Sequence, residues 1–199
     1  MKKIFLFLCV GLLSVNVFSQ KKTRGGAERS GAKSTTVSVF PKLDNLQVEV
    51  RAGKFQVAIS EKGKANDALV VKEVTTGYAP NECKLSSFMA SGVKLYLLTW
   101  TELSQTKSTN KTEDKTTIYS VVYEITSKKQ VHSNYQLTNH ITEKVFLGGT
   151  AASETQEKVR REGFEFVLNP DGSITQKNKT QQTTLVYDKD KMVFVSKKK

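Results

Sequence analysis

The chain has 199 residues, of which 31 are Lys or Arg and 19 are Asp or Glu, so its formal net charge at pH 7 is +12. An excess of this size favours anionic partners such as lipopolysaccharide, an acidic glycan or anionic lipid, although lysines spread along a whole chain also serve simply to keep a protein in solution. With only two cysteines, the chain is not a small domain held together by several disulfides.

Residues 1–19 have the layout of a secretory signal peptide. Two lysines precede a nearly continuous apolar run from Ile4 to Val15, and cleavage is expected after Ser19. The alternative, a buried N-terminal helix or strand, fits less well because a basic, glycine-containing stretch follows at once. The apolar run is also shorter than the roughly 20 residues that span a bilayer. We therefore expect no transmembrane segment in a mature chain that begins at Gln20.

The two cysteines bear on where the protein is located. Cys9 is not expected to carry a lipid, because Leu8 stands where a lipoprotein signal has a small residue and because Cys9 lies in the middle of the apolar run. Only Cys83 then remains in the mature chain, so no disulfide can form within it. A short basic leader and an exported chain without disulfides favour the periplasm or cell surface of a Gram-negative bacterium.

Residues 20–36, QKKTRGGAERSGAKSTT, are expected to form a flexible basic arm. The segment has one acidic residue and almost no apolar side chain, so burial cannot offset the entropy lost on ordering it. Such an arm can anchor the protein to an anionic surface, or it can be only a spacer between the signal and the folded domain. The residues predicted to bind an anionic partner are Lys21, Lys22, Arg24, Arg29 and Lys33.

The same stretch superficially resembles a phosphate-binding loop. Gly26 and Gly31 have the separation of the two glycines in such a loop, but Ala32 stands where the lysine must follow directly. A phosphate loop also needs a helix after it, whereas residues 35–39 are typical of extended chain. The sequence therefore predicts no nucleotide binding and indicates no cofactor.

From residue 37 onward the apolar residues recur with a period of two, which predicts a single antiparallel β-domain over 37–199. Residues 46–51 and 54–60 alternate cleanly, and Ala52-Gly53 between them predicts a tight hairpin turn. Residues 67–74 form the next expected strand. The expected apolar face of the hairpin comprises Leu46, Val48, Val50, Phe55, Val57 and Ile59.

Residues 92–104 predict a long strand with apolar groups on both faces, Leu95 and Leu97 on one and Leu98 and Trp100 on the other. A polar loop is expected over 104–115. Further strands are predicted over 116–127, 130–139 and 140–149.

One short surface helix is predicted over 153–163. Ser153 and Gln156 match a capping box, and Gly163 is a suitable residue for the end of a helix. Val159 is its only large apolar residue, so this helix would have little to bury.

The remaining residues return to hairpins. Asn169-Pro170-Asp171-Gly172 predicts a strong turn, and 183–195 predict a last hairpin around Lys189-Asp190. About ten strands in sequential hairpins predict an up-and-down barrel or a two-sheet sandwich. A propeller stays open as an alternative. An outer-membrane barrel is disfavoured, because Glu49 and Arg51 lie on the face that would meet lipid.

No catalytic or metal site is indicated. His132 and His140, expected on neighbouring strands near Glu143, lack a clear third ligand. Cys83 has no histidine near it in sequence and is expected to be a buried structural thiol, and no Gly-x-Ser-x-Gly motif occurs. Strand carboxylates such as Glu102 are expected to be solvated rather than paired for hydrolysis.

Three functional hypotheses follow. The first is a non-catalytic envelope domain whose basic arm and surface engage an anionic partner. The second is a barrel that binds a small apolar ligand in an interior lined by Tyr96, Leu98 and Trp100. The third is an unrecognised hydrolase. Nucleic-acid stacking on these aromatic residues is disfavoured by export.

Overall fold

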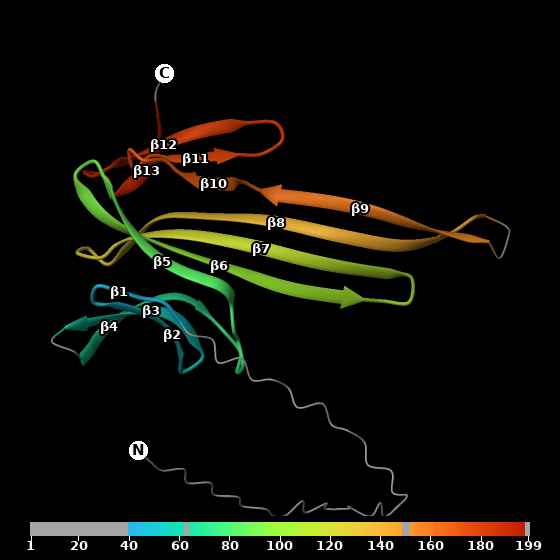
Figure 1. Cartoon of the computed structure of the whole chain (residues 1–199), viewed down its shortest axis with the longest axis horizontal. Coiled ribbons are helices and arrows are strands. Elements are labelled where there is room, and N and C mark those ends of the chain that lie inside the picture. Colours follow the sequence, from blue (N-terminus) through green and yellow to red (C-terminus); the bar gives the residue numbers. More distant parts are fainter. Residues whose placement is uncertain (1–39, 62–63, 149–151, 198–199) are drawn as a thin grey trace, which may run out of the picture. The chain divides into compact units, whose positions relative to one another are not determined.

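The apolar alternation is matched by antiparallel strands throughout the part of the chain that the structure describes (Figure 1). The computed structural model describes residues 40–61, 64–148 and 152–197. These residues contain strands β1 to β13 in three antiparallel sheets, and none of them is in a helix. They all belong to one compact unit, Val37–Lys199. The sheets are open and not closed into a barrel.

The first sheet has the strand order β1-β2-β3-β4 and contains the predicted hairpin. Arg51 pairs with Lys54, so Ala52 and Gly53 alone make the turn. Both have positive φ angles, 50° and 73°, as a tight hairpin requires. The hairpin predicted from the alternation is therefore confirmed. The strands are β1 (Lys42–Leu43), β2 (Leu46–Arg51), β3 (Lys54–Glu61) and β4 (Lys64–Glu73).

The central sheet has the order β5-β6-β7-β8-β9 and contains the longest strands. The polar loop predicted over 104–115 is wrong, because β6 continues to Lys107 and β7 begins at Lys111. Both faces are polar there because no other sheet covers them, not because the chain leaves the sheet. The strands are β5 (Asn81–Ala90), β6 (Val93–Lys107), β7 (Lys111–Glu124), β8 (Lys129–Phe146) and β9 (Ser153–Gly163).

The third sheet has the order β10-β11-β12-β13 and is built from short hairpins. Its first turn is the predicted one: the N–H of Gly172 donates to the carbonyl of Asn169 at 3.0 Å, and Gly172 has a φ of 79°. The predicted hairpin around Lys189-Asp190 joins the last two strands. The strands are β10 (Glu165–Leu168), β11 (Ile174–Lys177), β12 (Gln182–Asp188) and β13 (Val193–Ser196).

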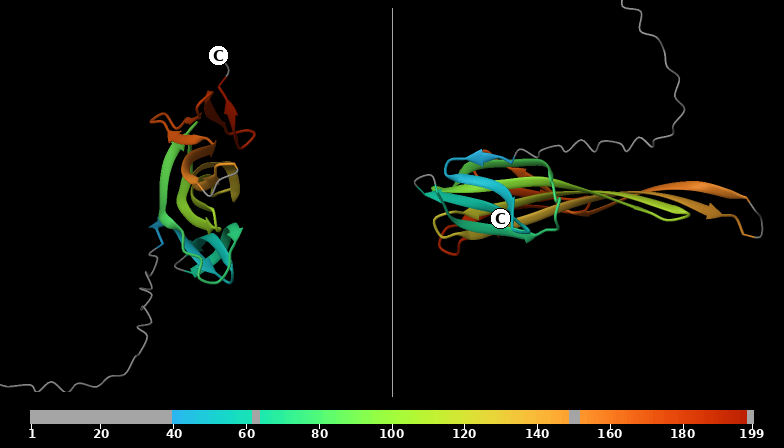
Figure 2. Two further views of the ribbon diagram at one scale, coloured as in Figure 1. Left: turned by 90° about the vertical axis from the view of Figure 1, so that its right-hand side faces the viewer. Right: turned by 90° about the horizontal axis from the view of Figure 1, so that it is seen from below.

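The core consists of two apolar clusters, one on each face of the central sheet. Leu98 and Trp100 of β6 pack with Phe55 and other residues of the first sheet. Leu95 and Leu97, on the opposite face of β6, pack with Ile174 and other residues of the third sheet. Figures 1 and 2 show the first and third sheets on opposite sides of the central one. This explains why the sequence of β6 is apolar on both faces.

The helix predicted over 153–163 is wrong, because these residues form β9 and pair with β8 along its whole length. With Val159 as its only large apolar residue, a helix there would bury almost nothing. Pairing with β8 instead gives the backbone its hydrogen bonds. Glycine is required at position 163, but not to end a helix. Its φ is 75°, and a Cβ there would lie 2.1 Å from the carbonyl oxygen of Tyr135.

Candidate functional site

The predicted signal peptide and the predicted basic arm lie outside the described residues. This applies to segments 1–19 and 20–36 and to every cation predicted there to bind an anionic partner, namely Lys21, Lys22, Arg24, Arg29 and Lys33.

The three residues predicted to line an apolar interior are packed between the first and central sheets. Tyr96, Leu98 and Trp100 are 8%, 0% and 3% exposed. Trp100 stacks on Tyr119 with ring centroids 4.7 Å apart and packs edge-on against Phe55 at 5.3 Å. None of the three lines any of the pockets described below. Their role in the structure is core packing.

Glu102 is the centre of a hydrogen-bond network at the border of this core. Its Oε1 accepts hydrogen bonds from Lys72 Nζ at 2.6 Å, Tyr78 Oη at 2.6 Å and Trp100 Nε1 at 2.8 Å. The Lys72 ammonium also lies over the ring of Tyr78, 4.9 Å from its centroid, a favourable cation–π position. Lys72 is on β4 and Glu102 on β6, so this network ties the first sheet to the central one.

The charge state of Glu102 follows from these donors. Burial raises the pKa of the carboxyl group, but the hydrogen bonds from Lys72, Tyr78 and Trp100 outweigh that effect and the net pKa is lowered. Burial, and then the hydrogen bond to Glu102, raise the pKa of Tyr78. Glu102 is therefore an ionised carboxylate at neutral pH, with three donors on its Oε1. It is a structural link and is not suited to act as a general acid.

Two further strand carboxylates and the thiol of Cys83 are also engaged structurally. Glu124 accepts hydrogen bonds from the backbone N–H groups of Thr126 and Ser127, at 3.0 and 2.7 Å. Glu143 pairs with Lys158 at 3.6 Å. Cys83 is half-buried against the first apolar cluster, and burial raises the pKa of its thiol to about 11.

The prediction that the two histidines lie on neighbouring strands is wrong, because His132 and His140 are both on β8. Over the described residues, no three His, Cys, Asp or Glu side chains are grouped so that they could hold a metal ion. No helix within the described ranges is long and apolar enough to cross a membrane.

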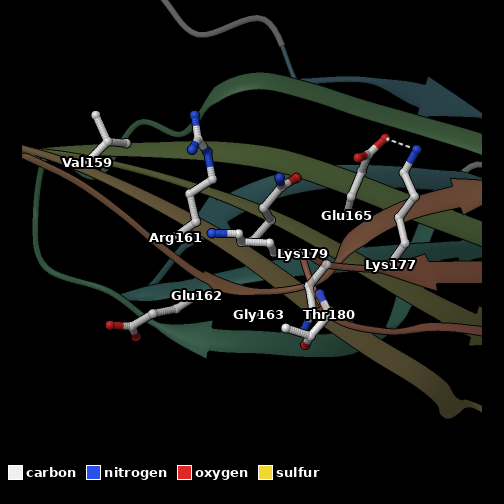
Figure 3. Close-up of a pocket in the computed structure, with 10 residues that line it drawn as sticks. Val159, Arg161, Glu162, Gly163, Glu165, Lys177, Lys179 and Thr180 are labelled. Atoms are coloured by element: carbon white, nitrogen blue, oxygen red, sulfur yellow. Dashed lines mark hydrogen bonds and ion pairs between the residues drawn. The ribbon is translucent and has the colours of Figure 1, made fainter.

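A hollow of about 670 Å³ lies between the β8–β9 pair and the turn that joins β11 to β12 (Figure 3). We call it the basic pocket. It is lined from the central sheet by Gln136, Arg161 and Gly163, and from the third sheet by Lys177, Asn178, Lys179 and Thr180, among others.

Arg161 and Lys179 of the basic pocket are positioned by hydrogen-bonded backbone. Arg161 is on β9, opposite Thr138 of β8. Lys179 is in the β11–β12 turn, which the Asn178 side chain organises: its Oδ1 accepts hydrogen bonds from the N–H groups of Thr180 and Gln181, at 3.0 and 2.9 Å. The turn is thus fixed by its own hydrogen bonds, and it presents Lys179 to the pocket.

The charges in the basic pocket are not balanced. Lys177 pairs with Glu165 at 3.2 Å, and Figure 3 shows Glu162 directed away from the other lining side chains. Neither Arg161 nor Lys179 forms an ion pair with a carboxylate of the described residues. The pocket is therefore lined by two cations without an ion pair, Arg161 of β9 and Lys179 of the β11–β12 turn.

A second hollow, of about 460 Å³, adjoins the basic pocket, since Gly163 and Asn178 line both. We call it the amide hollow. Its other lining residues carry no charge: Ser133, Asn134, Tyr135, Phe164 and Gln176.

The sequence alone does not indicate these pockets. The pattern around Arg161 predicts the end of a helix, and Lys179 belongs to a polar turn with no distinguishing motif. Arg161 and Lys179 line one pocket only because β9 pairs with β8 and because the third sheet packs beside that pair. No local sequence pattern predicts that these two residues line the same pocket.

Comparison with known proteins gives no relative: no family model, no curated protein and no solved structure matches this chain. Its function is therefore inferred from its own residues.

Proposed function

We propose that this chain is an exported, non-catalytic β-domain that binds an anionic partner, and that the basic pocket is the binding site of its folded part. The observation that carries this proposal is the pair Arg161 and Lys179, which line one concave site without a carboxylate partner. Two cations in one hollow repel each other, and a bound anion relieves that repulsion.

The chemistry of the pocket suits such a ligand. The guanidinium of Arg161 can donate two parallel hydrogen bonds to a carboxylate, sulfate or phosphate group, while Lys179 supplies a compact charge. The amide of Gln136 and the hydroxyl of Thr180 add uncharged donors in the same lining. Both cationic side chains are exposed in the free protein, so an approaching anion reaches them directly.

The basic arm provides the second part of the proposal. The net charge of +12 and the cations of residues 20–36 support a general attraction to an anionic envelope surface, with the pocket supplying a specific contact. Export to the periplasm or cell surface is part of the same proposal and is supported by the signal-peptide pattern of residues 1–19.

The test compares two double variants of the mature chain that remove the same charge. Arg161→Gln with Lys179→Gln removes the pocket cations, and Lys84→Gln with Lys189→Gln removes two exposed cations elsewhere. Calorimetric titration with inorganic tripolyphosphate is expected to show binding that weakens at least tenfold in the first variant and less than twofold in the second. Equal effects in both variants would remove the pocket from the proposal.

The arm is tested separately with vesicles that contain anionic lipid. Neutralising its five cations to glutamine is expected to lower salt-sensitive adhesion to these vesicles. Unchanged adhesion would leave the arm as a spacer only.

A further inference from the structure

We infer that the anionic ligand is an acidic saccharide, whose charged group occupies the basic pocket while a sugar ring occupies the adjoining amide hollow. This inference rests on the proposed function and deepens it. Two features carry it: the two hollows are neighbours that share Gly163 and Asn178 in their linings, and the second hollow has a polar, aromatic and uncharged lining.

The amide hollow has the side-chain types that recognise a sugar. Tyr135 lines it and is 47% exposed as a residue. An exposed aromatic ring of this kind offers an apolar surface to the C–H face of a pyranose, together with a polar tip. No cation of the described residues lines the hollow, so it offers nothing to a second charged group. A bare polyanion would therefore leave it unused.

The amides of the hollow are already held in place. Gln176 Nε2 donates to Asn134 Oδ1 at 2.8 Å, and Asn134 Nδ2 donates to the carbonyl oxygen of Phe164 at 2.9 Å. Asn134 is only 7% exposed. Polar groups fixed in this way bind hydroxyl groups without a further ordering cost. The chain thus places oriented amide groups next to an aromatic ring and two cations.

Gly163 belongs to the lining of both hollows. A Cβ at this position would lie 2.1 Å from the carbonyl oxygen of Tyr135 and 3.3 Å from its ring carbon Cδ2. Glycine at 163 therefore lets the end of β9 lie directly against Tyr135, which places the aromatic ring of the amide hollow next to the basic pocket.

The experiment uses three soluble probes on the mature chain: a uronic-acid tetrasaccharide, the same tetrasaccharide with its carboxylates methyl-esterified, and inorganic tripolyphosphate. Each is titrated calorimetrically into the wild type and into two variants. Tyr135→Leu removes the ring from the amide hollow. Phe146→Leu is the matched control, because Phe146 is an equally exposed aromatic residue on the same strand, 55% exposed, that lines neither hollow.

The expected result is tight binding of the uronic-acid tetrasaccharide, at least tenfold weaker binding of its ester, and a loss of about tenfold with Tyr135→Leu but not with Phe146→Leu. Tripolyphosphate binding is expected to be the same in all three proteins. If Tyr135→Leu leaves the tetrasaccharide unaffected, or if tripolyphosphate binds more tightly than the tetrasaccharide, the saccharide inference is overturned while the anion site stands. If neither anion binds the wild type, both proposals fail. Unchanged fluorescence of Trp100 in each variant shows that the core is intact.

Discussion

The indole N–H of Trp100 and the phenol of Tyr78 donate to the same oxygen, Oε1 of Glu102, at 2.8 and 2.6 Å. Lys72 contacts that oxygen as well. Three donors from β4, β6 and the connection between β4 and β5 thus meet on one carboxylate at the border of the first apolar cluster. The stability of the contact between the first and central sheets is therefore expected to depend on this single charge.

Replacing Glu102 by glutamine keeps the shape of the side chain but removes the charge that Lys72, Tyr78 and Trp100 bind. The free energy of unfolding is expected to fall by about 1–3 kcal/mol, the usual worth of hydrogen bonds to a charged group. Urea denaturation followed by fluorescence measures this directly, because Trp100 is the only tryptophan. Glu157→Gln is the control, since Glu157 is exposed on β9 and is expected to change stability by less than about 0.5 kcal/mol.

The effect of Glu102→Gln is also expected to depend on pH. The pKa of Glu102 is lower in the folded protein than its usual 4.5, so its stabilising contribution is complete above about pH 5 and is lost as the pH falls through the folded pKa. The difference in unfolding free energy between wild type and variant is thus largest at pH 7 and shrinks below pH 4. A difference that is constant from pH 7 to pH 3 would contradict the assigned charge.

Gly163→Ala is expected to destabilise the fold far more than Gly77→Ala. Both glycines have positive φ angles, 75° and 85°, so alanine costs about 1–2 kcal/mol at either position. Only at Gly163 does the added Cβ meet backbone, 2.1 Å from the Tyr135 carbonyl oxygen, and overpacking of this kind adds about 1–3 kcal/mol. Thermal unfolding of the two variants gives the comparison. Equal losses would mean that β9 can shift away from β8 at no cost.

His132 is expected to make the stability of the fold fall in mild acid. Its ring packs near Phe166 and Phe194 of the third sheet, with centroids at 6.1 and 5.6 Å, and burial lowers its pKa from the usual 6.5. The unfolded chain therefore takes up a proton that the folded chain resists, so stability is lost as the pH falls below about 6.5.

His132→Gln is expected to remove this slope between pH 7 and pH 5, as measured by urea midpoints, while His140→Gln leaves it in place because His140 is exposed. If the two variants retain the same slope, the acid sensitivity has another origin.

The thiol of Cys83 is expected to react slowly in the native protein. Its pKa of about 11 leaves little thiolate at pH 8, and the thiolate is the reactive form. Labelling with a disulfide reagent at pH 8 is expected to be more than tenfold slower in native protein than in urea. A native rate as fast as the unfolded rate would show that Cys83 is more accessible than its packing in the first cluster indicates.

The hairpin at Ala52-Gly53, the turn at 169–172 and the two apolar faces of β6 could all be predicted from the sequence. Each depends on local features. A two-residue alternation determines which side chains share a face, and tight turns need residues that accept a positive φ. The alternation of Leu95 and Leu97 with Leu98 and Trp100 predicted apolar groups on both faces of this strand, and the structure covers both.

The tertiary structure alone decided the polar segments and the candidate site. Residues 104–115 and 153–163 contain too little apolar sequence to show a period, and their backbone became β-structure because neighbouring strands offered hydrogen-bond partners. The pairing of β9 with β8, and the packing of the third sheet beside it, then brought Arg161 and Lys179 to one pocket. Strand pairing between distant segments depends on partners that no local pattern identifies, so the sequence determined the strands of the core and the fold determined the site.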